Sequence, residues 1–291
     1  MESGELLKKV RQIEIKTRGL SRNIFAGEYH SAFKGRGMTF SEVREYQFGD
    51  DVRSIDWNVT AKLQRPYVKI FEEERELTVM LMIDVSASNM FGSSDKLKKD
   101  IMTEIAATLA FSAIQNNDKI GVIFFTDRIE KFIPPKKGRK HILYIIRELI
   151  NFEPQGKDTD IGLLLRYFTN VMKKRCTAFL LSDFIADVNY EEAAIIANRK
   201  HDVTMVHIYD RRDTQLPKVG LLKLKDPETG QRIWVNSSDR RVRMSYINYW
   251  NKSVLTMQHI ALSSRMDIIG IETKEDYVRQ LLVFFRRRRA Y

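Results

Sequence analysis

The sequence predicts a doubly wound α/β fold built around a mostly parallel sheet. Short apolar runs without polar alternation recur between residues 78 and 208, and stretches with apolar residues at helical spacing separate them. Unbroken apolar runs are typical of strands buried on both faces. Strands that alternate with helices form right-handed parallel units, which place helices on both faces of the sheet. Hydrophobic residues make up 43% of the 291 residues, which is enough to bury such a core.

The first predicted units lie between residues 78 and 150. Residues 78–83 and 120–125 are continuous apolar runs and form the first two strands. Between them, a helix is indicated by apolar residues that recur every four positions, namely Leu97, Ile101, Ile105, Leu109 and Ala113. Residues 131–133 form a short partner strand before two prolines, and residues 141–150 form a helix.

The alternation continues to residue 208 and then changes. Residues 221–225 and 232–235 flank the turn sequence Asp-Pro-Glu-Thr-Gly, which predicts a β-hairpin. The remaining predicted elements, in chain order, are a helix at 161–171, a strand at 178–181, a helix at 191–198, a strand at 203–208, a helix at 244–263, a strand at 266–271 and a helix at 275–285.

Residues 1–76 differ from the rest of the chain. A helix is predicted at 6–17, followed by polar and aromatic residues that alternate weakly, as at 67–71. We therefore expect an N-terminal segment at 1–76 and a main domain at 77–291, with the hairpin as an insertion at about 219–236.

The formal net charge of +11 is concentrated near the C-terminus. Residues 211–291 carry 17 basic and 8 acidic residues, whereas residues 1–76 and 77–210 each have a net charge of +1. The chain ends in an arginine run formed by Arg286, Arg287, Arg288 and Arg289. This run is interpreted as the solvated end of a packed helix, with an acidic protein or a peripheral membrane contact as alternatives; nucleic acid is disfavoured because no aromatic residues are interleaved.

The remaining composition limits the function. The chain has one cysteine, Cys176, no secretory leader and no apolar run long enough to cross a membrane, so we expect a cytoplasmic protein. No phosphate-binding loop and no Ser-His-acid spacing is present, so we expect no enzyme. Cys176 is interpreted as an inert buried thiol, His207 as a core residue and His201 as solvent-facing.

Polar oxygen-bearing residues follow two predicted strands and open one predicted helix. They are Asp84, Ser86, Ser88, Thr159 and Asp183. Ligands of open α/β sheets bind beyond the carboxyl ends of the strands, so these side chains can meet. Hard oxygen donors favour Mg²⁺ or Mn²⁺. The alternative for each residue is a helix cap or a strand-end turn, and for Thr159 the cap could be shared with Asp160.

This ordered set resembles the metal-ion-dependent adhesion site of von Willebrand factor A domains. The resemblance implies direct cation binding by Ser86 and Ser88, and direct or water-mediated binding by Asp84, Thr159 and Asp183. The long motif at residues 35–57, which ends in Ser54-Ile55-Asp56-Trp57, is similar to the signature of the bacterial domain-of-unknown-function family 58. Here Asn89 separates Ser88 from Met90, a departure at a residue that is not an expected ligand.

The resemblance implies a protein-protein interaction module that works with a MoxR-type AAA+ ATPase in the assembly or activation of other proteins. An acidic residue of that ATPase or of its substrate would complete the metal site. The alternatives are a metal-dependent hydrolase, with Asp183 or Asp210 as general base, and a binder of anionic surfaces through the basic C-terminal third. The motif at 35–57 is either a hydrogen-bonded platform or a partner-facing surface.

Overall fold

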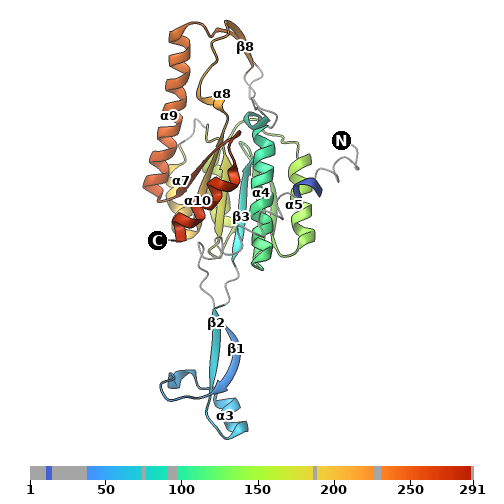
Figure 1. Cartoon of the computed structure of the whole chain (residues 1–291), viewed down its shortest axis with the longest axis vertical. Coiled ribbons are helices and arrows are strands. Elements are labelled where there is room, and N and C mark those ends of the chain that lie inside the picture. Colours follow the sequence, from blue (N-terminus) through green and yellow to red (C-terminus); the bar gives the residue numbers. More distant parts are fainter. Residues whose placement is uncertain are drawn as a thin grey trace. The chain divides into compact units, whose positions relative to one another are not determined.

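The computed structural model describes residues 11–14, 38–73, 77–90, 97–185, 189–225 and 231–289 (Figure 1). The chain forms two compact units. One comprises Phe33–Leu77, and the other comprises Thr78–Tyr291 together with Met1–Ala32. Of the helix expected at 6–17, residues 11–14 are helical and the rest lies outside the described residues.

The larger unit contains a six-stranded sheet in the order β10-β7-β6-β3-β4-β5. All neighbouring strands are parallel except β4 and β5, which pair antiparallel at one edge. The strands are β3 (Thr78–Asp84), β4 (Lys119–Phe125), β5 (Ile129–Lys136), β6 (Thr177–Ser182), β7 (Asp202–Tyr209) and β10 (Asp267–Glu272). The mostly parallel α/β architecture predicted from the apolar runs is therefore confirmed.

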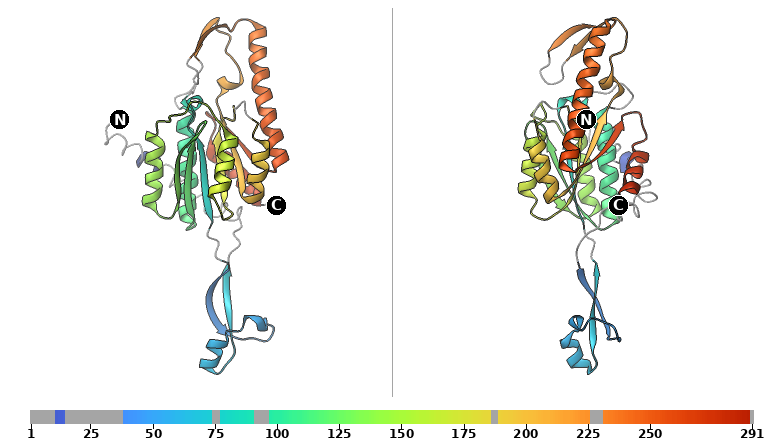
Figure 2. Two further views of the ribbon diagram at one scale, coloured as in Figure 1. Left: turned by 180° about the vertical axis from the view of Figure 1, so that it is seen from behind. Right: turned by 90° about the vertical axis from the view of Figure 1, so that its left-hand side faces the viewer.

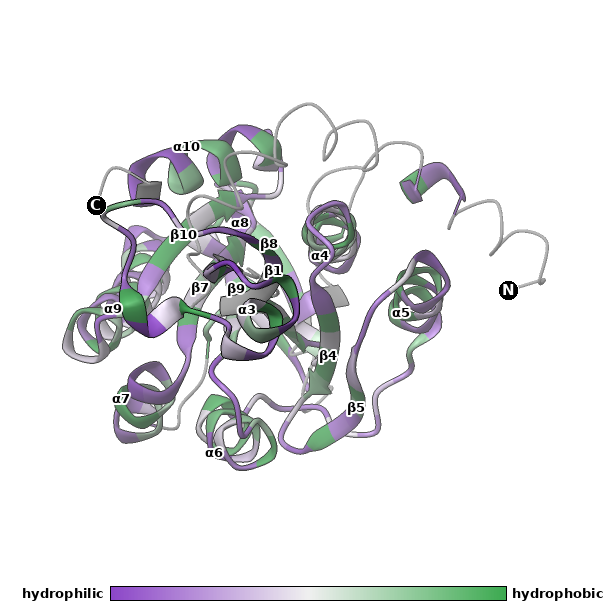
Figure 3. Cartoon of the chain, turned by 90° about the horizontal axis from the view of Figure 1, so that it is seen from below, coloured by the Kyte–Doolittle hydropathy of each residue, from purple (hydrophilic) through white to green (hydrophobic). Residues whose placement is uncertain are grey.

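Helices cover both faces of this sheet (Figures 2 and 3). One layer consists of α4 (Lys98–Gln115), α5 (Arg139–Asn151) and α10 (Tyr277–Arg289), and the other of α6 (Ile161–Val171), α7 (Glu191–Lys200) and α9 (Arg240–Ser264). Alternate residues of a strand point to opposite faces. Met80 and Met82 of β3 thus join the core under α6, α7 and α9, while Leu81 is equally buried on the opposite face.

The edge strand explains where the doubled proline can lie. Pro134 and Pro135 belong to β5, which is longer than the expected strand at 131–133. Proline cannot donate to a sheet, so it is tolerated in an edge strand.

The hairpin predicted after residue 220 is also present: β8 (Leu221–Lys225) pairs antiparallel with β9 (Arg232–Asn236), and the turn between them lies outside the described residues. A short helix, α8 (Arg211–Thr214), precedes it.

The smaller unit is built on a two-stranded antiparallel ribbon. β1 (Met38–Glu45) pairs with β2 (Tyr67–Glu73), and between them lie η2 (Val52–Ser54) and α3 (Trp57–Leu63). Asp56 caps α3 by accepting from the backbone N–H groups of Asn58 and Val59. The sequence analysis did not predict α3, because seven residues are too few to display a helical period.

The aspartates of the 35–57 motif serve local turns within this unit. Arg44 forms a two-pronged ion pair with Asp50, with N–O distances of 2.7 and 2.8 Å, and Asp50 also accepts from the Gln47 backbone N–H. Such paired hydrogen bonds fix geometry. Among the described helices of the whole chain, none combines the length and hydropathy that a membrane span requires.

Candidate functional site

The five candidate site residues lie at or near the end of the main sheet where the parallel strands have their carboxyl ends. Asp84 is the last residue of β3, and Asp183 directly follows β6, the parallel neighbour of β3. Both carboxylates are 1% exposed, Ser86 and Thr159 are buried, and Ser88 is half-buried. The expected convergence at the carboxyl ends of the strands is thus observed for these side chains.

Hydrogen bonds connect four of these residues. Asp84 Oδ1 accepts from the Ser86 backbone N–H at 2.9 Å, and Asp84 Oδ2 accepts from the Thr159 hydroxyl at 3.4 Å. The hydroxyl oxygens of Ser86 and Ser88 are 3.1 Å apart. The short turn η3 (Ala87–Met90) brings the second serine beside the first. Asp84, Ser86, Ser88 and Thr159 therefore form one oxygen cluster.

The loop before α6 delivers Thr159 to this cluster. Asp160 is the N-cap of α6 and accepts from the Leu163 backbone N–H at 2.8 Å, which leaves the Thr159 hydroxyl for Asp84. Gly156 allows the loop to approach the residues that follow β4, because a side chain there would lie 2.1 Å from the Thr126 hydroxyl. Asp160, and not Thr159, is thus the N-cap of α6, and the Thr159 hydroxyl donates to Asp84.

Asp183 has a different set of contacts. The Lys98 ammonium lies 2.8 Å from Asp183 Oδ2 and 3.2 Å from Asp213 Oδ2. Burial acts to lower the pKa of Lys98, but the charges of Asp183 and Asp213 outweigh it and raise that pKa. Burial, together with the negative charge of Asp183, raises the pKa of Asp84 to about 6. The site is therefore a place where an added positive charge is favourable.

Sequence reasoning missed three contributors. Ser182 donates to Asp84 Oδ2 at 2.6 Å, and Lys98 reaches Asp183 from the first turn of α4. The third is Asn89, whose amide nitrogen donates to the Asp84 carbonyl and the Ser86 hydroxyl, both at 3.2 Å. Ser182 and Asn89 each had a local signal, since they adjoin the predicted ligands Asp183 and Ser88; Lys98 had none.

A pocket of about 220 Å³ opens beside Asp84 and Ser86 of the cluster. Its lining includes Asp84, Ser86 and Asn89, together with the basic residues Lys99 and Lys157. The Asn89 side-chain oxygen is buried and accepts no hydrogen bond from any part of the chain that the structure describes. A buried acceptor without a partner is costly, so a positively charged or donating ligand in this pocket would stabilise it.

The donor set fits a hard divalent cation. Its atoms are hydroxyl, carboxylate and amide oxygens, the ligands that Mg²⁺ and Mn²⁺ prefer. Among the described residues, no three or more His, Cys, Asp or Glu side chains are grouped as a metal centre. Any cation here would consequently rely on Ser86, Ser88 and Thr159 as well as on the two carboxylates.

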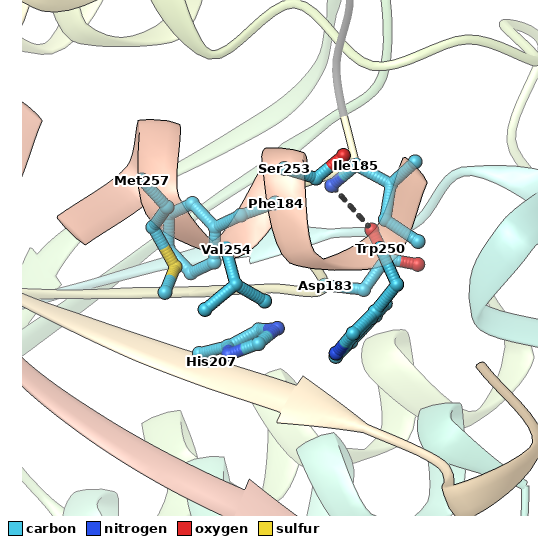
Figure 4. Close-up of a pocket in the computed structure, with 8 residues that line it drawn as sticks. All are labelled: Asp183, Phe184, Ile185, His207, Trp250, Ser253, Val254 and Met257. Atoms are coloured by element: carbon cyan, nitrogen blue, oxygen red, sulfur yellow. Dashed lines mark hydrogen bonds between the residues drawn. The ribbon is translucent and has the colours of Figure 1, made fainter. Parts of the chain in front are cut away.

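His207 and Trp250 pack against each other next to Asp183 (Figure 4). His207 is 5% exposed and stacks on Trp250, with a centroid distance of 5.6 Å. Burial lowers the pKa of His207 to about 4, so the ring is neutral at pH 7. His207 is thus a core residue, as expected. Figure 4 also shows the Ile185 backbone N–H donating to Asp183, at 3.3 Å.

Asp210, Cys176 and His201 lie outside the oxygen cluster and have other roles. Asp210 is the N-cap of α8, accepting from the Arg212 backbone N–H at 2.8 Å and from the Thr273 hydroxyl at 2.7 Å, so it acts as a strand-end cap. Cys176 is buried, as expected, and burial raises the pKa of its thiol to about 12. The solvent-facing position expected for His201 is wrong: its side chain is fully buried beside Phe168.

The fold and the site together define a class of protein. A doubly wound sheet with this strand order, one antiparallel edge strand and a polar cluster beyond β3 and β6 is of the von Willebrand factor A type. The chain belongs to the family described as "Protein of unknown function DUF58", which matches residues 42–254.

The chain is also similar to uncharacterized relatives and to a solved structure. "Uncharacterized protein Rv1480" of Mycobacterium tuberculosis is 28% identical over 232 residues, which is 79% of this chain and 73% of the relative. "Uncharacterized protein YeaD" of Bacillus subtilis is 24% identical over 109 residues, covering 38% of this chain and 25% of the relative. The crystal structure of the conserved hypothetical protein BatB from Bacteroides thetaiotaomicron matches 74% of this chain and 100% of that chain, with a TM-score of 0.51 and 14% identity. This last likeness supports the fold alone.

Proposed function

We propose that this chain is a protein-protein interaction module that depends on Mg²⁺ or Mn²⁺. The cation would be held by Asp84, Ser86, Ser88, Thr159 and Asp183, and a carboxylate of the partner protein would complete its coordination. The observation that carries this proposal is the hydrogen-bonded oxygen cluster beside a pocket, in which the buried Asn89 oxygen accepts no hydrogen bond from the described residues.

Different residues of the chain would orient the cation ligands and attract the partner carboxylate. Bound Mg²⁺ would supply positive charge and an exchangeable coordination position that a carboxylate can fill. Ser182 and the Ser86 backbone N–H hold the Asp84 carboxylate in one orientation. Lys99 and Lys157 line the pocket and would attract an acidic side chain towards it.

The partner we propose is a MoxR-type AAA+ ATPase or the substrate of that ATPase, as the family resemblance implies. The location we propose is the cytoplasm, as expected from the composition. A binding role is favoured over hydrolysis because both candidate bases are engaged. Asp210 caps α8, and Asp183 is paired with Lys98. A general base must be free to accept a proton from a bound water.

The proposal predicts that capture of the partner depends on the cation and on Asp84. The immobilised full-length chain would be tested for retention of a purified MoxR-type ATPase in Mg²⁺ and in EDTA. We expect EDTA and Asp84→Asn each to reduce retention at least about tenfold, since a divalent site loses affinity when a charged ligand is removed.

Asp158→Asn is the matched control, because Asp158 is exposed, lies next to Thr159 and does not line the pocket. It should retain the ATPase as the unmodified chain does. Retention that neither EDTA nor Asp84→Asn changes would contradict the proposal for this partner.

A further inference from the structure

Lys98 is a buried cation at the proposed cation site. Its side chain is 1% exposed, and its ammonium contacts Asp183 at 2.8 Å and Asp213 at 3.2 Å. These partners lie 85 and 115 residues further along the chain. Asp183 is one of the five proposed cation ligands, so a protein cation already neutralises part of that site.

The position of Lys98 would be unfavourable without these carboxylates. It is the first residue of α4, an 18-residue helix, and the N-terminal end of a helix dipole repels positive charge. Burying an ammonium is also strongly unfavourable unless it is paired. Asp183 and Asp213 offset both penalties, and the paired ammonium in turn explains how the buried Asp183 carboxylate can persist near Asp84.

We propose that Lys98 sets the cation affinity of this site by competing with the divalent cation for Asp183. The inference rests on the proposed function, because it concerns the same cluster. A cation bound at Asp84 and the serines gains the full charge of Asp183 only when the ammonium gives up its contact with that carboxylate. The affinity is therefore weaker than the oxygen donors alone would provide.

Asp213 gives the displaced ammonium a second anchor. It lies in α8 and its Oδ2 also accepts from the Asp210 backbone N–H at 2.8 Å, so its position is held independently of Lys98. An ammonium group has three donors and can keep one carboxylate while it leaves another. Lys98 can thus stay charged and buried in both states of the site.

The test compares cation binding by full-length variants. Calorimetric titration with Mn²⁺ would measure the dissociation constant of the unmodified chain, Lys98→Met and Lys98→Arg. We expect Lys98→Met to bind Mn²⁺ at least about tenfold more tightly, because a repelling charge is removed from the site. Lys98→Arg keeps the positive charge and should stay within about threefold of the unmodified chain.

Lys131→Met is the matched control. Lys131 also forms an ion pair, with Glu148 at 2.6 Å, but it lies in β5 away from the cluster. If Lys98→Met does not fold, the double variant Lys98→Met/Asp213→Asn replaces it, since one unpaired carboxylate is then removed. A second readout is the melting temperature, which MgCl₂ should raise more in the variant than in the unmodified chain.

The outcomes separate the inference from the proposed function. Tighter binding by the folded Lys98→Met protein, alone or beside a weakly binding unmodified chain, supports the inference. Equal or weaker binding than a clearly binding unmodified chain overturns the inference and leaves the proposed function standing. Absence of binding in both proteins overturns the two together.

Discussion

Asp84 combines several hydrogen bonds with an unfavourable electrostatic environment. Its carboxylate accepts from Ser182, Ser86 and Thr159, yet it is 1% exposed and close enough to Asp183 for the charges to interact. The hydrogen bonds orient the group, while burial and the neighbouring charge raise its pKa to about 6. A side chain held in this way is suited to meet a cation without rearrangement.

His201 illustrates a second buried ionisable group, far from the cluster in sequence. Its Nδ1 lies 3.4 Å from the Cys176 sulfur, and its Nε2 has no hydrogen-bond partner in the described parts of the chain. Burial lowers the pKa of His201 to about 4, with the nearby charges of Lys200 and Arg175 acting in the same direction. The imidazole is consequently neutral in the folded protein at pH 7.

This pKa predicts how stability depends on pH. Below pH 6.5 the unfolded chain protonates His201 whereas the folded protein does not, so acidification towards pH 4 favours unfolding. We expect the free energy of unfolding to fall by about 2 kcal/mol more between pH 7 and pH 5 in the unmodified chain than in His201→Leu. Urea titrations at both pH values measure it.

His259→Leu is the control for this substitution, since the His259 side chain is 71% exposed on α9. The same pH dependence in His201→Leu and the unmodified chain would contradict this prediction, because it would show that folding does not lower the pKa of His201.

The candidate site was predictable only where its residues carry a local pattern. Asp84, Ser86 and Ser88 adjoin one strand, and Thr159 and Asp183 mark the ends of neighbouring elements, so chain order alone indicated them. Lys98 stands in a charged stretch that reads as a solvated helix start. Its partners are distant in sequence, and no period or motif reports a contact across 85 residues.

At the scale of elements, the C-terminal helix α10 differs most from its expected role. The arginine run was expected to be solvated, but Arg288 is 21% exposed and contacts Asp202, Asp267 at 3.0 Å and Thr204 at 3.3 Å. Asp202 and Asp267 begin β7 and β10. Arg288 therefore ties the end of α10 to the starts of two neighbouring strands, and a membrane contact through the run stays a prediction for its other members.

Removing this tie should destabilise the protein. We expect Arg288→Met to lower the free energy of unfolding by about 1–2 kcal/mol, because partly buried carboxylates lose a charged hydrogen-bond donor. Arg287→Met, at an exposed position of the same helix turn, should change it by less than about 0.5 kcal/mol. Equal effects in thermal or urea unfolding would contradict a structural role for Arg288.

The sheet and its helices were predictable because the apolar patterns are long and periodic. α9 begins earlier than predicted, at Arg240, and α10 begins later and ends later than predicted, at Tyr277 and Arg289. Most of the added residues are polar and carry no apolar period. In the smaller unit, β1 and α3 depend on a bulged ribbon and on the Asp56 cap, which weak alternation in the sequence could not indicate.

At the scale of the whole molecule, the charge of the chain and the charge of its site have opposite signs. Residues 211–291 hold most of the net charge of +11. The proposed cation site beyond β3 and β6 nevertheless contains two buried carboxylates, Asp84 and Asp183. The Lys98 ammonium pairs with Asp183 and with a third carboxylate, Asp213. The exposed Leu221, Ile233 and Trp234 belong to the hairpin within this basic region. The basic surface and the acidic site are thus distinct features of one chain.

The central claim is that the oxygen cluster binds one divalent cation. Calorimetric titration of the full-length chain with Mg²⁺ tests it most directly, with Asp84→Asn and the exposed Asp158→Asn measured beside it. We expect one site per chain with a dissociation constant of about 1 mM or tighter. The affinity for Mg²⁺ should be at least about tenfold weaker in Asp84→Asn and unchanged in Asp158→Asn. No binding by the unmodified chain at such concentrations, or equal binding by Asp84→Asn, would contradict it.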